Sequence, residues 1–146
     1  MKKIIICDHC DAINRIAVDK LNSTKPICGK CSTDLNTNPK IRTITFEKLE
    51  TIARHAQLPI LVDAYADWCG PCKMYGPIFQ QAGELLWKEA EFFKIDTEKN
   101  PMLSVKYGIR GIPMTLVFKN NQLINTQSGV LQQEHIQALI QATKNS

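Results

Sequence analysis

A short apolar run followed by an amphipathic stretch is the clearest pattern along this chain. Residues 59–66, with the sequence PILVDAYA, are largely apolar and begin at a proline, which predicts a buried central strand. Residues 73–87 then place apolar side chains at the spacing of one helical face, at Ile78, Phe79, Ala82, Leu85 and Leu86. The pattern therefore predicts a strand that runs into a helix across a tight turn.

Three further elements are predicted on either side of this unit. Residues 46–55 favour a helix that is capped by Thr45 and buries one apolar side. Residues 115–119 and 122–126 predict a hairpin with Asn-Asn at its turn, because asparagine tolerates positive φ. A last helix over about 132–143 packs through Ile136, Leu139 and Ile140.

The chain has 146 residues, and the elements above occupy its larger, C-terminal part. We therefore divide it into an N-terminal module, residues 1–38, and a larger domain, residues 39–146. The segment 33–40 is polar and rich in turn-forming residues, which is typical of a linker. A module as small as the first cannot bury a sizeable apolar core, so it needs another source of folding free energy.

Charge and hydropathy argue against some classes of function. The net charge is +4, and the lysines are spread rather than gathered in a stripe with aromatic residues, which argues against nucleic-acid binding. No stretch approaches the roughly 20 apolar residues of a membrane span, so we expect no membrane association. The first apolar run, residues 4–6, is too short for a signal peptide. We therefore expect a cytoplasmic protein.

Four of the six cysteines form two C-x2-C pairs in the N-terminal module: Cys7, Cys10, Cys28 and Cys31. Seventeen residues separate the two pairs, which is the spacing of a zinc ribbon. Four thiolates make a closed tetrahedral site, so we predict one structural Zn²⁺ that supplies folding free energy to the module. His9, inside the first pair, is interpreted as a surface residue.

Two other interpretations of these four cysteines stay open. They are two disulfides of a secreted module, or a site for iron in place of zinc. The expected cytoplasmic location favours metal over disulfides. A zinc site, in turn, is either a constitutive folding clip or a redox-responsive site that loses its metal on oxidation.

The remaining two cysteines lie in the pentapeptide Trp68-Cys69-Gly70-Pro71-Cys72, at the predicted turn from strand to helix. A helix start favours negative charge, so Cys69 is the candidate nucleophilic thiolate. Cys72, about one turn further in, is expected to be more buried and to resolve a mixed disulfide. Gly70 is expected to permit the tight turn, and Pro71 suits an early helical position. A metal half-site and a stapling disulfide are the alternatives.

This pentapeptide and the residues around it, from about 41 to 145, resemble the thioredoxin family, and the zinc-containing bacterial branch of that family in particular. The resemblance implies an α/β thioredoxin fold, a central mixed sheet flanked by helices. It also implies that Asp63 is the buried acid that exchanges a proton with Cys72. Lys94 matches the family lysine that approaches this acid from the adjacent strand and tunes it.

The resemblance extends to a substrate surface. Ile112 and Pro113 match the loop in which the proline is cis and the preceding backbone binds an extended substrate chain, and Gly129 and Trp68 match the same surface. Pro77 matches a proline that kinks the helix. The chain departs from many members at two places: Ala64-Tyr65 replaces two larger aromatic residues, and Met114 replaces a common threonine.

The function implied by the resemblance is protein-disulfide reduction by dithiol–disulfide exchange. Its partners would be disulfide-containing protein substrates and an NADPH-dependent thioredoxin reductase, and the protein would act as a monomer without a bound organic cofactor. Two alternatives remain. One is a thiol oxidase or isomerase of the same fold, and the other is a zinc-ribbon interaction protein whose larger domain is a scaffold.

Overall fold

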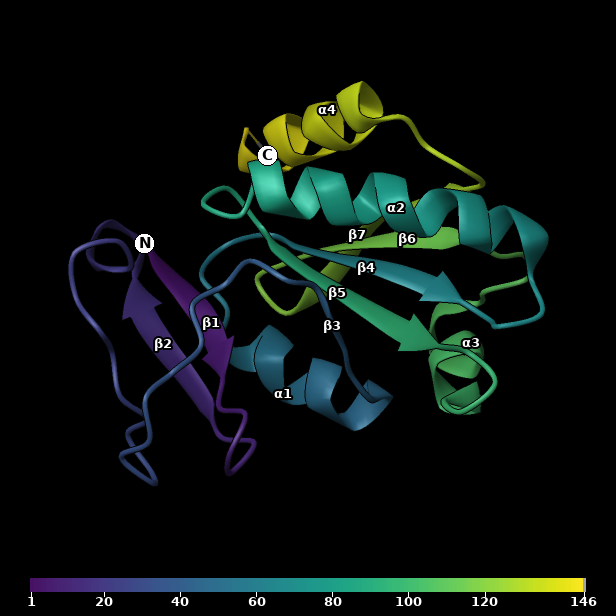
Figure 1. The fold of residues 1–146 in the computed structure, drawn as a ribbon. Coiled ribbons are helices and arrows are strands. Elements are labelled where there is room, and N and C mark those ends of the chain that lie inside the picture. The colour runs from purple at the N-terminus through teal and green to yellow at the C-terminus, as the bar shows by residue number, and fades with distance from the viewer. Residues whose placement is uncertain (146) are drawn as a thin grey trace.

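The computed structural model describes residues 1–145, and its larger domain is built on a twisted five-stranded sheet (Figure 1). The central strand is the one predicted before the dithiol; it runs parallel to one neighbour and antiparallel to the other. In order across the sheet the strands are β3 (Arg42–Thr43), β5 (Glu91–Asp96), β4 (Ile60–Tyr65), β6 (Met114–Lys119) and β7 (Gln122–Ser128). This is the mixed sheet that the resemblance implied.

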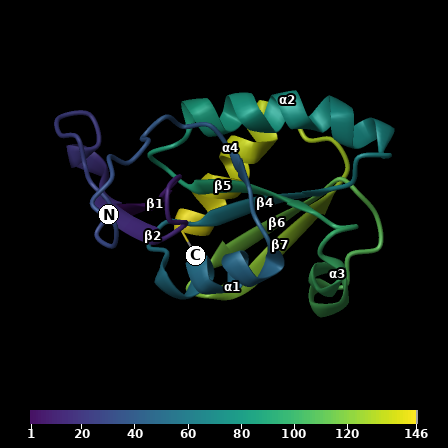
Figure 2. The ribbon, with the colours of Figure 1, turned by 60° about the horizontal axis from the view of Figure 1, so that its bottom comes forward.

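Two helices cover each face of this sheet (Figures 1 and 2). One face carries α2 (Gly70–Leu85) and α4 (Gln133–Lys144), and the other carries α1 (Phe46–His55) and α3 (Pro101–Tyr107). Each pair of helices buries its own apolar cluster against the sheet, so β4 is apolar on both faces except at Asp63. The predicted sandwich of helices on both faces of a sheet is therefore confirmed.

Local signals placed several of the predicted elements correctly. Thr45 caps α1, since its Oγ1 accepts a hydrogen bond from the Lys48 N–H at 3.1 Å. The hairpin of β6 and β7 turns at Asn120 and Asn121, both at positive φ, as predicted. One predicted detail of α2 was wrong: Leu85 is 63 % exposed, because it is the last residue of the helix and faces solvent. The helix continues through Pro77 without a break.

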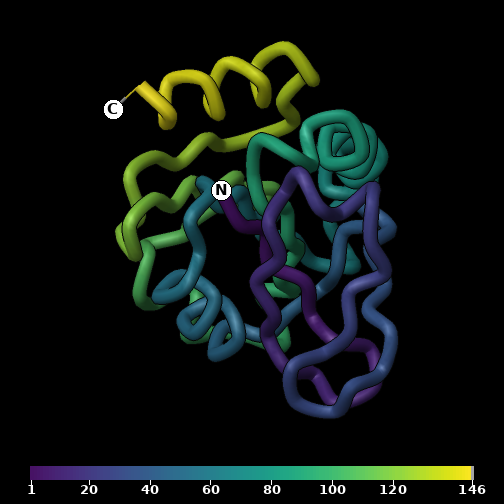
Figure 3. Tube along the Cα trace, turned by 90° about the vertical axis from the view of Figure 1, so that its left-hand side faces the viewer, coloured from purple at the N-terminus to yellow at the C-terminus, as the bar shows by residue number. Residues whose placement is uncertain are grey.

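The N-terminal module is a small hairpin followed by irregular chain, lying at one side of the larger domain (Figure 3). Its strands, β1 (Lys2–Ile6) and β2 (Ile13–Ala17), pair antiparallel and are followed by a 3-10 turn, η1 (Val18–Lys20). Successive side chains of β1 point to opposite faces. Ile4 and Ile6 therefore join the apolar cluster beneath the sheet, while Ile5 joins a second cluster with Cys7, Cys28, Leu21 and Leu35.

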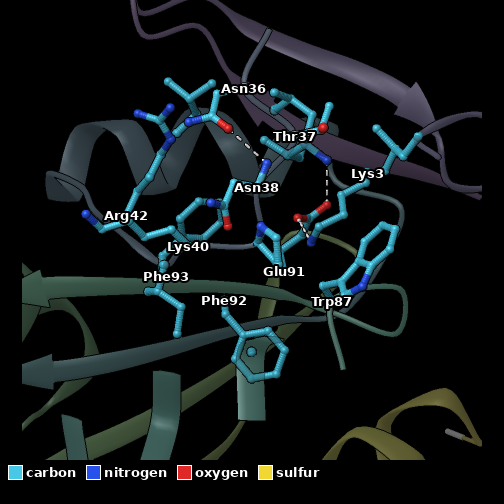
Figure 4. A pocket seen from close by; sticks show the side chains of 17 residues that line it. Lys3, Asn36, Thr37, Asn38, Lys40, Arg42, Trp87, Glu91, Phe92 and Phe93 are labelled. Carbon is cyan, nitrogen blue, oxygen red and sulfur yellow. Dashed lines mark hydrogen bonds and ion pairs between the residues drawn. The ribbon is translucent and has the colours of Figure 1, made fainter. Parts of the chain in front are cut away.

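A buried ion pair joins β1 to the start of β5. The Glu91 carboxylate, 1 % exposed, accepts hydrogen bonds from Lys3 Nζ at 2.8 Å and from the Ile4 N–H at 2.6 Å. Burial raises the pKa of Glu91, and the charge of Lys3 opposes that rise. Figure 4 shows this pair beside Trp87 and the irregular segment 36–40, at the wall of a cavity of about 60 Å³.

Two more ion pairs connect the first cysteine pair to the larger domain. Asp8 pairs with Arg42 of β3, and Asp11 pairs with Lys48 of α1 at 2.8 Å. The module is therefore attached through a strand and three ion pairs as well as through its linker. None of the helices in the described chain has the length and apolarity that crossing a membrane requires.

Candidate functional site

Cys69 and Cys72 lie where β4 gives way to α2, and they are joined in a disulfide. Cys69 is the N-cap of the helix, and its Sγ accepts a hydrogen bond from the Cys72 N–H at 3.2 Å. Pro71 lies in the first turn, where its missing N–H costs nothing. A free N–H aimed at a sulfur favours the thiolate of that sulfur. The local structure therefore distinguishes Cys69 from Cys72 chemically.

Burial does not distinguish the two cysteines, and here the sequence prediction was wrong. Cys69 is 3 % exposed and Cys72 is 5 % exposed, because Ile112 and Ala66 cover the sulfur at the helix start. Gly70 also differs from expectation. Its φ is not positive, and a Cβ built there would meet no atom within 4 Å, so the turn does not sterically require glycine.

A groove of about 390 Å³ runs past Cys69. Trp68, which is 68 % exposed, lines it together with Ile112, whose carbonyl oxygen is 3.7 Å from Cys69 Sγ. The Ile112–Pro113 peptide bond is cis, as the resemblance implied. Gly129, at φ +87°, donates its N–H to the Pro113 carbonyl at 2.8 Å and so lies beside the same loop. The structure thus brings the four residues assigned to a substrate surface to one side of the dithiol.

Asp63 is fully buried in β4, six residues before Cys69 in the sequence. Neither carboxylate oxygen has a hydrogen-bond partner among residues 1–145. Burial raises the pKa of Asp63 to about 7, and the charge of Lys94, its cross-strand partner on β5, opposes the rise. A carboxyl with a pKa near neutrality changes its proton occupancy easily, which is the property required of a proton donor and acceptor.

Several residues near the dithiol were missed by the sequence analysis. Glu98 accepts a hydrogen bond from Trp68 Nε1 at 2.7 Å and steadies that exposed ring. Tyr75, three residues after Cys72 on the same helical face, is hydrogen-bonded through its hydroxyl to Thr115 Oγ1 at 2.7 Å. The sequence could have indicated Tyr75, because its spacing from Cys72 places the two residues on one helical face. It could not have indicated Glu98, because 30 residues separate Glu98 from Trp68.

The second candidate site is the cluster of four free cysteines in the N-terminal module. All four Sγ atoms lie within 4.8 Å of one another, and two of the S···S distances, Cys7 to Cys31 and Cys10 to Cys28, are 3.7 and 3.6 Å. Sulfurs that bind one Zn²⁺ tetrahedrally at about 2.3 Å lie roughly 3.8 Å apart. The donor set and its spacing therefore fit zinc.

The two cysteine pairs adopt the same knuckle. In each, the N–H of the residue after the second cysteine bonds the carbonyl of the first at 2.9 Å; these residues are Asp11 and Ser32, both at positive φ. Gly29, inside the second pair, does not have a positive φ. The residue with positive φ is Ser32, three positions later, so the chain reverses direction after the second cysteine of the pair rather than between the two cysteines.

Asn14 supports the second knuckle from β2 and was not identified from the sequence. Its Oδ1 accepts the Gly29 N–H at 2.9 Å, and its Nδ2 lies 3.5 Å from Cys28 Sγ. N–H donors from Cys31, Asn14 and Lys30 lower the pKa of Cys28 to about 6, which favours the ligating thiolate. His9 is exposed, as expected, and is absent from the sulfur cluster.

Comparison with known proteins agrees with both sites. The family model described as "Thioredoxin" matches residues 40–142, and the one described as "Thioredoxin 2, N-terminal" matches residues 6–33. The chain is 35% identical over 134 residues to "Thioredoxin C-3" of Corynebacterium nephridii, covering 92% of this chain and 90% of that protein. A thioredoxin of Rickettsia bellii is 34% identical over 93 residues, covering 64% and 89%.

Solved structures show the same fold. A thioredoxin from Halobacterium salinarum superposes with a TM-score of 0.64 at 27% identity, covering 72% of this chain and 91% of that one. The uncovered part of this chain is larger than that of its match, as expected for a chain with an additional N-terminal module.

Proposed function

Because the chain belongs to the thioredoxin family and carries a zinc-ribbon module before the thioredoxin domain, we propose that it is a protein-disulfide reductase that acts through Cys69 and Cys72. The observation that carries the proposal is the Cys72 N–H aimed at Cys69 Sγ beside an open groove. That arrangement supports one activated sulfur next to space for a polypeptide substrate. The proposed domain boundary lies near residue 38, in the irregular segment before β3.

The proposed reaction begins with the reduced dithiol. The Cys69 thiolate attacks one sulfur of a substrate disulfide, a Cys69–substrate disulfide forms, and the other substrate sulfur leaves as a thiolate that takes up a proton. Cys72 then loses its proton and attacks Cys69 Sγ. The substrate sulfur that was bound to Cys69 leaves as a thiolate, and the Cys69–Cys72 disulfide forms. Two electrons have then passed from the protein to the substrate.

Asp63 is the proposed acceptor of the Cys72 proton. With its pKa near 7, it takes the proton in the resolving step and returns it to solvent later. Lys94 tunes this exchange by stabilising the ionised carboxylate. Trp68, Ile112, Pro113 and Gly129 form the proposed docking surface for the extended substrate chain.

The four cysteines of the N-terminal module are proposed to hold one Zn²⁺ per chain. Four thiolates leave no open position, so the metal would supply folding free energy and would not activate water. We further propose that an NADPH-dependent thioredoxin reductase regenerates the dithiol, and that the protein acts as a cytoplasmic monomer.

The test is insulin-disulfide reduction with NADPH and a thioredoxin reductase. The wild-type protein should be active, and Cys69→Ser should be inactive. Cys72→Ser should instead accumulate a stable mixed disulfide through Cys69, because the resolving sulfur is missing. Full activity of Cys69→Ser would contradict the proposed nucleophile.

The direction of the reaction is tested separately by equilibrium with glutathione. A reducing thioredoxin is expected near −270 mV, whereas a value well above roughly −230 mV would overturn the reductase proposal and favour an oxidase or isomerase.

A further inference from the structure

The Lys94 ammonium group is held in place by an aromatic ring. Its Nζ lies over the ring of Tyr65, 4.6 Å from the ring centroid. Tyr65 is the last residue of β4, two residues after Asp63 on the same strand. Helix α2 also approaches this ammonium group at Gly76, where an added Cβ would lie 3.6 Å from Nζ. A lysine ammonium over an aromatic face is attracted to the negative face of the ring.

Lys94 and Asp63 belong to a row of polar residues that crosses the sheet from strand to strand. Thr43, Lys94, Asp63 and Thr115 are successive Cα partners on β3, β5, β4 and β6. Cross-strand partners project from the same face of a sheet. The row therefore passes beneath α2, and it places Lys94 directly beside Asp63.

The Tyr65 side chain also interacts with the edge of the sheet. The Thr43 side chain acts on the Tyr65 hydroxyl and opposes the rise that burial causes in the pKa of Tyr65, while the ring faces Lys94. Without this ring, the half-buried Lys94 side chain would be free to extend into the open groove of about 410 Å³ that it lines with Cys72 and Lys73. Water in that groove would then solvate the ammonium group away from Asp63.

Building on the proposed role of Asp63 in disulfide exchange, we propose that Tyr65 is a positioning residue that holds Lys94 beside Asp63 and thereby sets the proton affinity of the buried acid. Tyr65 stands where many family members carry a larger aromatic residue. The ring supplies the cation–π contact, and the hydroxyl lies outside that contact.

The other ionisable groups around Asp63 are few. From α2, Tyr75 interacts with it, and the disulfide removes Cys69 and Cys72 from titration in the oxidised protein. Asp67 and Asp96 act on Tyr65 rather than on Asp63. Lys73 lines the groove, but the charge that acts on the pKa of Asp63 is that of Lys94. Lys94 is therefore the charge through which Tyr65 can act.

The experiment follows the Asp63 carboxyl carbon by NMR as pH is varied, in the oxidised, zinc-loaded, full-length protein. Lys94→Met should raise the midpoint of the Asp63 titration, because the carboxylate loses its positive neighbour. Tyr65→Leu should raise it in the same direction, by at least half as much. Tyr65→Phe keeps the ring and should stay near the wild-type value, and the matched control Lys73→Met should not shift the midpoint.

The double variant Tyr65→Leu/Lys94→Met tests whether Tyr65 acts on Asp63 through Lys94 or independently of it. It should match Lys94→Met alone, since the effect of the ring on Asp63 passes through the ammonium group. An unchanged midpoint in Tyr65→Leu, or a full additional shift in the double variant, would overturn the proposal.

A measurement on the wild-type protein tests the contact between Lys94 and Tyr65 even if a variant fails to fold. The ε-methylene protons of Lys94 should be shifted upfield by the ring current of Tyr65, and a random-coil position would also overturn the proposal. These readouts do not depend on turnover. If the protein fails to reduce insulin while the Asp63 titration still responds to Tyr65→Leu, the reductase proposal fails and the positioning proposal stands.

Discussion

The buried carboxyl of Asp63 should make the protein less stable as the pH rises. Its pKa is about 7 in the folded protein against an ordinary value of 3.8, so the folded state holds this proton more tightly than the unfolded chain. The contribution to the free energy of unfolding therefore falls as pH rises from about 4 to about 7. At about 1.4 kcal/mol for each unit, the full loss is about 4 kcal/mol, of which about 2 kcal/mol falls between pH 5.5 and 8.

Chemical unfolding of wild-type protein and Asp63→Ala, both oxidised and zinc-loaded, measures this loss between pH 5.5 and 8. The variant should gain about 2 kcal/mol relative to the wild type across this range, because it has no carboxyl to ionise. Taking the difference between the two proteins cancels the titration of all shared groups. Asp63→Asn is the control for packing: its absolute stability differs from that of Asp63→Ala, but its pH dependence should be the same. A wild-type-minus-variant difference that stays constant with pH would refute the reasoning.

Three further predictions concern the packing of the larger domain, the ion pair that joins it to the N-terminal module, and the zinc site. Gly83→Ala should lower the free energy of unfolding by about 1 kcal/mol, because its Cβ would lie 2.9 Å from Ile41 Cδ1; Ile41→Val should restore part of the loss in a double variant. Glu91→Ala should cost about 3 kcal/mol by leaving the buried Lys3 charge unpaired, and Lys3→Met should recover most of it; an equal loss in the double variant would contradict the ion-pair explanation. Removing zinc with a chelator should speed amide hydrogen exchange at Cys28 far more than in β4, whereas uniform acceleration would show that the two units unfold together.

The sharing of β1 between two apolar clusters changes how the N-terminal module is understood. Ile4 and Ile6 pack with the larger domain while Ile5 packs with the cysteine knuckles. The proposed boundary near residue 38 therefore divides the chain but not its packing, because side chains of β1 belong to clusters on both sides of it. A truncated protein that begins at residue 39 would lose two core residues along with the zinc module.

Local chemistry explains what the sequence by itself determined. The apolar run before the dithiol, the Thr45 cap and the Asn-Asn turn depend on neighbouring residues only, so their signals were readable and the elements form where predicted. The same holds for the C-x2-C pairs, because two cysteines three positions apart bring their sulfurs together within one turn of chain. The proton-exchange role proposed for Asp63 came instead from resemblance, since the apolar run predicts that the strand is buried but not what its carboxyl does.

Tertiary structure decided the features that depend on residues far apart in the sequence. The nearly equal burial of Cys69 and Cys72 arises from Ile112, which folds over the helix start from 43 residues away. The contact of Lys94 with Tyr65, and the burial of Glu91 against β1, follow from strand order and register. Desolvation and long-range contacts determine the protonation of buried groups such as Glu91, and both arise only when the chain folds.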